Sequence, residues 1–122
     1  MTTAAGRRWL SVHVLDVTVG LPGAGMAITL LRHAHEGPIV VAEVVTNADG
    51  RTDGPLLEGD DLTSDTYELA FELGAYFGPT AAVGSEPFLD VVPVRFHVSD
   101  ADAHVHVALL ATPWSYTTYR GS

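Results

Sequence analysis

Turn residues punctuate this chain at short intervals, and no segment between them has the periodicity of a long helix. Most of the segments between the turns alternate apolar and polar residues or are rich in β-branched residues. Successive side chains of a strand point to opposite faces, so this alternation is typical of strands with one buried face. We expect strands at residues 9–15, 26–31, 39–46, 55–58, 67–73, 91–98, 104–111 and 115–119, and one short helical turn within residues 74–80.

Short strands with turn signals every ~8–12 residues indicate a β-sandwich or a β-barrel. No helical segment of about ten or more residues separates the strands, which excludes βαβ units. A chain of 122 residues is expected to form a single domain over residues 1–122. A domain of this size buries roughly two thirds of the surface that its unfolded chain exposes, which is enough for an ordinary core.

The composition excludes several kinds of chemistry. There is no cysteine, so disulfides, thiol nucleophiles and cysteine-bound zinc are absent. All six cationic side chains are arginines, which removes Schiff-base catalysis and the P-loop lysine. Asp and Glu total 15, and the net charge is −9. Because such a chain repels phosphate, we expect it to bind neither nucleic acid nor an anionic membrane surface.

A membrane span is not expected either, because a spanning helix needs ~20 apolar residues and no apolar run of this sequence approaches that length. The pair Arg7-Arg8 resembles the start of a twin-arginine export signal. However, the residues that follow, 11–16, contain no continuous apolar region and are better interpreted as a strand. We therefore expect a cytoplasmic protein.

The segment His104-Val105-His106 places two imidazoles on one face of a predicted strand and Val105 on the other. Such a pair can be part of a solvated polar face, can supply a neutral general base near pH 7, or can bind zinc. The motif alone does not choose among these three. His13 shares a strand face with Ser11, and taken alone it is a common kind of strand histidine.

Arg51 follows the tight-turn signal of residues 47–50, from where its planar guanidinium can reach over a sheet face towards a carbonyl or an oxyanion. A solvated turn arginine is the alternative. A calcium loop over residues 47–60 is excluded, because Arg51 would stand where an oxygen ligand is needed and Asp60 would replace the closing glutamate. The chain also lacks the G-x-S-x-G, H-E-x-x-H and G-x-G-x-x-G motifs.

Three separate motifs together resemble the 5-hydroxyisourate hydrolases, the transthyretin-related enzymes of urate breakdown. They are Leu-Ser-Val-His-Val-Leu-Asp at 10–16, Thr-Asn-Ala-Asp-Gly-Arg-Thr-Asp-Gly-Pro-Leu-Leu at 46–57, and the run from His-Val-His-Val at 104–107 to the terminal Tyr-Arg-Gly-Ser at 119–122. The resemblance covers nearly the whole chain. The terminal tetrapeptide is the part that distinguishes the enzymes from hormone-carrying transthyretins.

The resemblance implies which residues are functional. It assigns catalytic roles to His13, Arg51 and His106, and substrate binding to His13, Arg51, Tyr119 and Ser122. His104 is the first histidine of the family's His-Tyr-His pattern and is not expected to be catalytic. The chain departs from the family at three positions, where a small polar residue, an aromatic residue and a proline are usual: Val12, Val105 and Ala108.

The resemblance also implies a transthyretin-like β-sandwich of two four-stranded sheets with one short helix, assembled as a homotetramer with active sites at the dimer–dimer interface. The implied reaction is hydrolysis of 5-hydroxyisourate to 2-oxo-4-hydroxy-4-carboxy-5-ureidoimidazoline, without a cofactor or metal. The His13/His106 pair would activate water and Arg51 would polarise the carbonyl. Two other classes stay open: a transthyretin-like carrier, and a zinc enzyme that uses His104, His106 and either His97 or His13.

Overall fold

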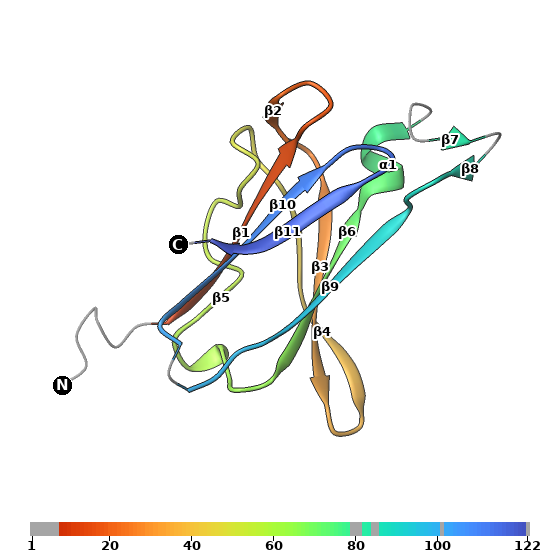
Figure 1. Ribbon diagram of the computed structural model, residues 1–122. Helices are drawn as coiled ribbons and strands as arrows, with labels where there is room; N and C mark the ends of the chain where they lie inside the picture. The colour runs from red at the N-terminus through yellow and green to blue at the C-terminus, as the bar shows by residue number, and fades with distance from the viewer. Residues whose placement is uncertain (1–7, 79–81, 84–85, 101, 122) are drawn as a thin grey trace.

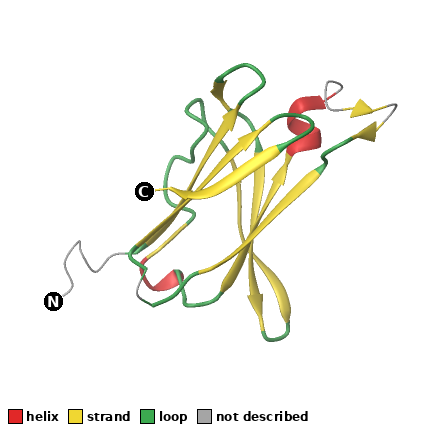
Figure 2. Cartoon of the chain, viewed as in Figure 1, coloured by secondary structure: helices red, strands yellow, loops and turns green. Residues whose placement is uncertain are grey.

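The computed structural model describes residues 8–78, 82–83, 86–100 and 102–121. Its strands form two facing layers with one short α-helix, α1 (Leu73–Phe77), at one end (Figures 1 and 2). The predicted all-β sandwich with a single short helix is therefore confirmed. Among the described residues, no helix is long and apolar enough to cross a membrane.

The first sheet has the strand order β11-β10-β1-β2. Its long strands β1 (Trp9–Asp16) and β10 (His104–Ala111) are parallel, and β11 (Tyr116–Gly121) is antiparallel to β10. The short strand β5 (Leu57–Glu58), within the predicted strand at 55–58, also pairs with β1, so this sheet has five strands and not the four expected. The short β2 (Leu21–Pro22) lies in a segment that the sequence predicts only as a turn.

The second sheet is antiparallel throughout and has the order β4-β3-β6-β9. Its strands are β3 (Ala27–Ala34), β4 (Gly37–Val45), β6 (Thr66–Glu72) and β9 (Val91–His97). Outside the two sheets lie the 3-10 helix η2 (Gly59–Asp61) and a small hairpin of β7 (Ala82–Val83) with β8 (Glu86–Pro87).

Alternating burial along β1 shows how the sequence positions this sheet. Leu10, Val12 and Val14 are at most 1% exposed and face the second sheet, whose Leu69 and Phe71 are fully buried. The intervening side chains of β1 point the other way, to the outer face of the first sheet. The pairing registers place on this outer face Trp9, Ser11, His13, His104, His106, Ala108, Leu110, Thr117, Tyr119 and Gly121.

Hydrogen bonds hold the loop between β4 and β5 against β1. The Val14 amide donates a hydrogen bond of 2.8 Å to the carbonyl oxygen of Gly50. Gly50 has a φ of +74°, and a Cβ at this position would collide with the carbonyl oxygen of Val14. Only glycine allows this approach, and the chain continues from it directly into Arg51.

Candidate active site

Two histidines from distant parts of the chain meet on the outer face. His13 lies on β1 and His106 on β10, and their ring centroids are 6.5 Å apart with a tilt of 40°. His106 is only 8% exposed. An imidazole this well covered does not belong to a freely solvated polar face, which was one of the three interpretations of the His104-Val105-His106 motif.

Asn47 organises the loop that carries Arg51. Its side-chain oxygen accepts hydrogen bonds from the amides of Asp49 at 2.9 Å and Arg51 at 3.2 Å, and its amide nitrogen donates to Asp53 at 3.1 Å. The sequence predicts a turn here, but not this role of Asn47. An Asx-type turn of this kind holds the loop in one conformation.

His13 connects the same loop to β1. Its Nε2 lies 3.1 Å from the carbonyl oxygen of Asp49. A carbonyl oxygen only accepts, so Nε2 is the donor, and a neutral His13 has its lone pair on Nδ1. This contact determines both the ring position and the tautomer of His13.

The electrostatics of the site favour neutral imidazoles. Burial, followed by the nearby Arg51 charge, lowers the pKa of His13 below its ordinary value, although the contact with Asp49 partly opposes this. Burial also lowers the pKa of His106, with further contributions from Arg51, His104 and His13. Both groups therefore resist protonation near pH 7 and are able to accept a proton in a reaction. The shared effect of Arg51 supports the prediction that its guanidinium reaches this face.

Ser11 is a site residue that the sequence analysis did not identify. Its hydroxyl lies 2.7 Å from Nδ1 of His106 and 3.0 Å from Nε2 of His104. The sequence placed Ser11 and His13 on one strand face, but only the parallel register of β1 and β10 shows that Ser11 stands opposite His106. The Trp9 ring, with its centroid 4.4 Å from that of His104, packs on the far side of this group.

The last strand, β11, borders the site. Tyr119 pairs with Ala108 and is 55% exposed on the outer face, whereas Gly121 pairs with His106. A Cβ at Gly121 would lie 2.5 Å from Cδ2 of His106, so the imidazole occupies the space that a side chain would need. The remaining predicted site residue, Ser122, lies outside the described residues.

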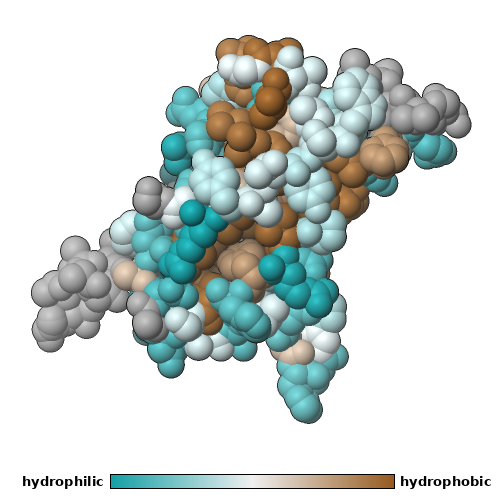
Figure 3. Space-filling view, viewed as in Figure 1, coloured by the Kyte–Doolittle hydropathy of each residue, from teal (hydrophilic) through white to brown (hydrophobic). Residues whose placement is uncertain are grey.

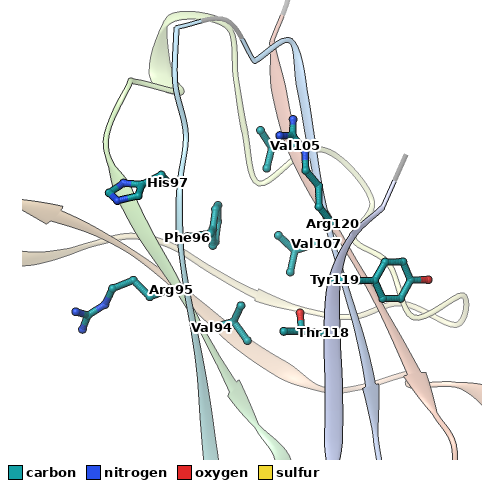
Figure 4. A pocket seen from close by; sticks show the side chains of 9 residues that line it. All are labelled: Val94, Arg95, Phe96, His97, Val105, Val107, Thr118, Tyr119 and Arg120. Carbon is teal, nitrogen blue, oxygen red and sulfur yellow. The ribbon is translucent and has the colours of Figure 1, made fainter.

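A pocket of about 240 Å³ opens elsewhere, between the edge strands β9 and β11. Figure 4 shows Val94, Phe96 and Val107 directed into it, while Tyr119 points to the opposite side of β11. In the space-filling view, apolar surface is visible in a hollow between hydrophilic side chains (Figure 3). His13, Arg51 and His106 do not line this pocket, so it is separate from the predicted site.

The zinc alternative does not match the positions of its ligands. His97 lies on β9 in the second sheet, where its Nδ1 is 2.8 Å from the Thr66 hydroxyl. Within the described ranges, no group of three His, Asp or Glu side chains is placed to hold a metal ion. The histidines of the first sheet are engaged with Ser11 and the Asp49 carbonyl instead.

The model of the HIUase/Transthyretin family matches residues 10–121. The chain belongs to this family. A family member from Deinococcus radiodurans, described as 5-hydroxyisourate hydrolase, is 49% identical, and the match covers 97% of this chain and 99% of the relative.

Two solved structures of the family illustrate its range. The 5-hydroxyisourate hydrolase of Klebsiella pneumoniae is 31% identical, with a TM-score of 0.77 over 94% of this chain and 99% of that one. Sea bream transthyretin in complex with thyroxine is 28% identical, with a TM-score of 0.82 over 92% of this chain and 93% of that one. The family fold is thus shared by enzymes and by a thyroxine-binding protein.

Two of the three departures from the family pattern lie away from the outer face. Val12 and Val105 are 1% and 4% exposed and belong to the core between the sheets. Ala108 does lie on the outer face, in register with His13 and Tyr119, and is 5% exposed. Only Ala108 therefore borders the candidate site.

We predict that Arg51→Gln raises the pKa values of both His13 and His106, because the substitution removes a positive charge that disfavours imidazolium. The measurement is an NMR titration of the two imidazole rings. Arg95→Gln is the matched control, since Arg95 pairs with Glu68 on the second sheet and its loss should leave both values unchanged. Unchanged pKa values in Arg51→Gln would show that the guanidinium does not act on this face.

We predict that Gly121→Ala displaces the His106 ring while the fold is retained. The added methyl group would meet the tip of a side chain rather than backbone, and the ring can move aside. The histidine NMR signals should shift, and the circular dichroism spectrum should not. A Gly121→Ala variant with the native His106 signals would contradict the packing described above.

Proposed function

We propose that this chain is a 5-hydroxyisourate hydrolase that opens one ring C–N amide bond of its substrate and yields 2-oxo-4-hydroxy-4-carboxy-5-ureidoimidazoline. The observation that carries the proposal is the pairing of His13 and His106 at 6.5 Å between ring centroids, with the charge of Arg51 acting on both. The names of the relatives from Deinococcus radiodurans and Klebsiella pneumoniae support the same activity.

Amide hydrolysis requires an activated water, a polarised carbonyl and a proton for the leaving nitrogen. Neutral imidazoles meet the first requirement, since a base whose pKa lies below the ambient pH is mostly unprotonated. The Arg51 guanidinium meets the second, because its fixed fork of donors can stabilise the developing oxyanion. The imidazole that took this proton from water then donates it to the leaving nitrogen, which meets the third requirement. No step in this scheme requires a metal or a cofactor.

Two C-terminal residues complete the proposed substrate site. Tyr119 presents its exposed phenol on the same face as His13 and His106, where it can bind the polar edge of a purine-sized ring. Ser122 follows Gly121, which pairs with His106, and we assign it the same task.

We further propose that the chain assembles as a homotetramer with active sites at the dimer–dimer interface. His13 and His106 lie on the outer face, which also carries the exposed Tyr119. A second copy facing this surface would convert it into a closed cleft, and symmetric pairing of identical faces is a common mode of assembly. Desolvation of this kind strengthens the electrostatic contribution of Arg51. The cytoplasmic location remains a prediction.

We expect the purified protein to accelerate the ultraviolet decay of freshly generated 5-hydroxyisourate above its spontaneous rate. His106→Ala should lower turnover by about 10²–10⁴-fold, the usual contribution of a general base. Arg51→Lys should lower it by about 10²–10³-fold, since a point charge does not replace the planar fork.

His35→Ala is the matched control for these variants, because His35 is an exposed histidine in the turn between β3 and β4. It should retain wild-type turnover. If the wild-type protein binds the substrate or other aromatic ligands without turnover, the proposal fails and a carrier is the better interpretation.

Leu110→Glu tests the proposed assembly, because Leu110 lies on the outer face in register with Leu15 and Thr117. A charge there should prevent two such faces from meeting, so sedimentation velocity should show a species smaller than a tetramer with reduced turnover. Val40→Glu, at a residue of β4 that is 52% exposed, should leave the assembly intact. A fully active Leu110→Glu monomer would contradict an interfacial site.

A further inference from the structure

Three side chains form a continuous row behind the candidate site. The Ser11 hydroxyl stands between Nδ1 of His106 at 2.7 Å and Nε2 of His104 at 3.0 Å. A hydroxyl has a single proton, so it donates to one imidazole and accepts from the other. The tautomers of the two histidines are therefore coupled. When His106 carries its proton on Nδ1, Nε2 of His104 is unprotonated. When Nε2 of His104 carries a proton, Nδ1 of His106 is unprotonated.

The surroundings of the His106 ring indicate which nitrogen faces the substrate. Nδ1 is engaged with Ser11 on one flank, and Cδ2 packs against Gly121 on the other. The remaining Nε2 lies on the distal edge of the ring, away from its own backbone, and has no hydrogen-bond partner among the described residues. His13 differs, because its Nε2 already donates to the Asp49 carbonyl. Of the two histidines, His106 is the better placed to act as the base.

We propose that Ser11 and His104 form a proton relay behind His106, an inference that rests on the proposed role of His106 as general base. In the resting state His106 Nδ1–H donates to Ser11, and Ser11 donates to His104 Nε2. When Nε2 of His106 takes a proton from the attacking water, its Nδ1 proton passes to Ser11 and the Ser11 proton passes to His104. The hydroxide oxygen bonds to the substrate carbonyl carbon, and the positive charge then resides on His104.

The second half of the reaction reverses the transfer. His106 donates its Nε2 proton to the leaving ring nitrogen as the C–N bond breaks, and it recovers a proton at Nδ1 from Ser11. Ser11 in turn recovers its proton from His104. The sum is the addition of one water molecule across the C–N bond, and all three residues return to their starting tautomers. Ser11 and His104 act only through His106, so they are positioning residues.

The structure favours His104 as the temporary site of the positive charge. The pKa of His106 is lowered by burial first and then by the charges of Arg51, His104 and His13. His104 instead packs on the Trp9 ring, with centroids 4.4 Å apart and an interplanar angle of 34°. A cation over the face of a tryptophan is stabilised by the ring quadrupole. The relay therefore places the charge on a ring that lies against an aromatic surface.

Ser11→Ala and Ser11→Thr test the relay in the full-length protein. We expect Ser11→Ala to lower kcat by about tenfold or more with little change in KM, because the base loses its positioning partner and not its substrate contacts. Ser11→Thr keeps a hydroxyl and should restore most of kcat. Thr66→Ala is the matched control, since it removes a hydroxyl–imidazole contact of 2.8 Å with His97 on the other sheet. Its kcat should be that of the wild type.

A second readout does not depend on activity. Nitrogen-15 NMR of the imidazoles should show His106 in the Nδ1–H form in the wild type and in the Nε2–H form in Ser11→Ala. His104→Phe retains a ring against Trp9 but removes the acceptor nitrogen, and it should lower kcat as Ser11→Ala does. If wild-type His106 is in the Nε2–H form, or if Ser11→Thr is as slow as Ser11→Ala, the relay is overturned. If the wild type does not hydrolyse 5-hydroxyisourate, the proposed function fails, and the NMR result still decides the tautomer coupling.

Discussion

The parallel pairing of β1 with β10 is the constraint on which the candidate site depends. It brings Ser11 opposite His106 and His13 opposite Ala108, although these strands are far apart in the chain. A shift of the pairing register by one residue would point every outer side chain towards the core. Burial of a Leu or Val contributes about 1.5–3 kcal/mol, more than the roughly 0.5–1.5 kcal/mol of one hydrogen bond. The core side of the sheet therefore determines the register, and the imidazole contacts follow from it.

The pKa values of His13 and His106 depend on a nearby charge more than on the net charge of the chain. The chain carries a formal charge of −9, yet the charge that acts most on both His13 and His106 is the positive one of Arg51. Exposed charges farther than a Debye length of about 8 Å are largely screened at physiological salt. Gly50 allows the loop that carries Arg51 to approach β1. A conformational property of one glycine thus contributes to the protonation state of two histidines.

Alternation and turn residues were sufficient to predict the long strands, the short helix and the division of β1 and β10 into core and outer faces. They also predicted a short strand at 55–58, where β5 lies, but not β2 or the hairpin of β7 and β8. Resemblance supplied His13, Arg51, His106 and Tyr119 as a set. The bridging position of Ser11 was not predictable, because one strand shows which side chains share a face but not which residue of another strand stands opposite.

The two faces of the first sheet obey separate requirements, and this separation explains how one family holds both a thyroxine-binding protein and hydrolases. The inward positions need only apolar side chains of suitable volume, so Val12 and Val105 fit the core although the family usually has other residues there. The outward positions carry no such packing requirement. Ser11, His104 and His106 can therefore be selected for proton chemistry without loss of the sandwich. Gly121 of the terminal strand contributes to the outer face as well, because the absence of a side chain there leaves space for the His106 ring.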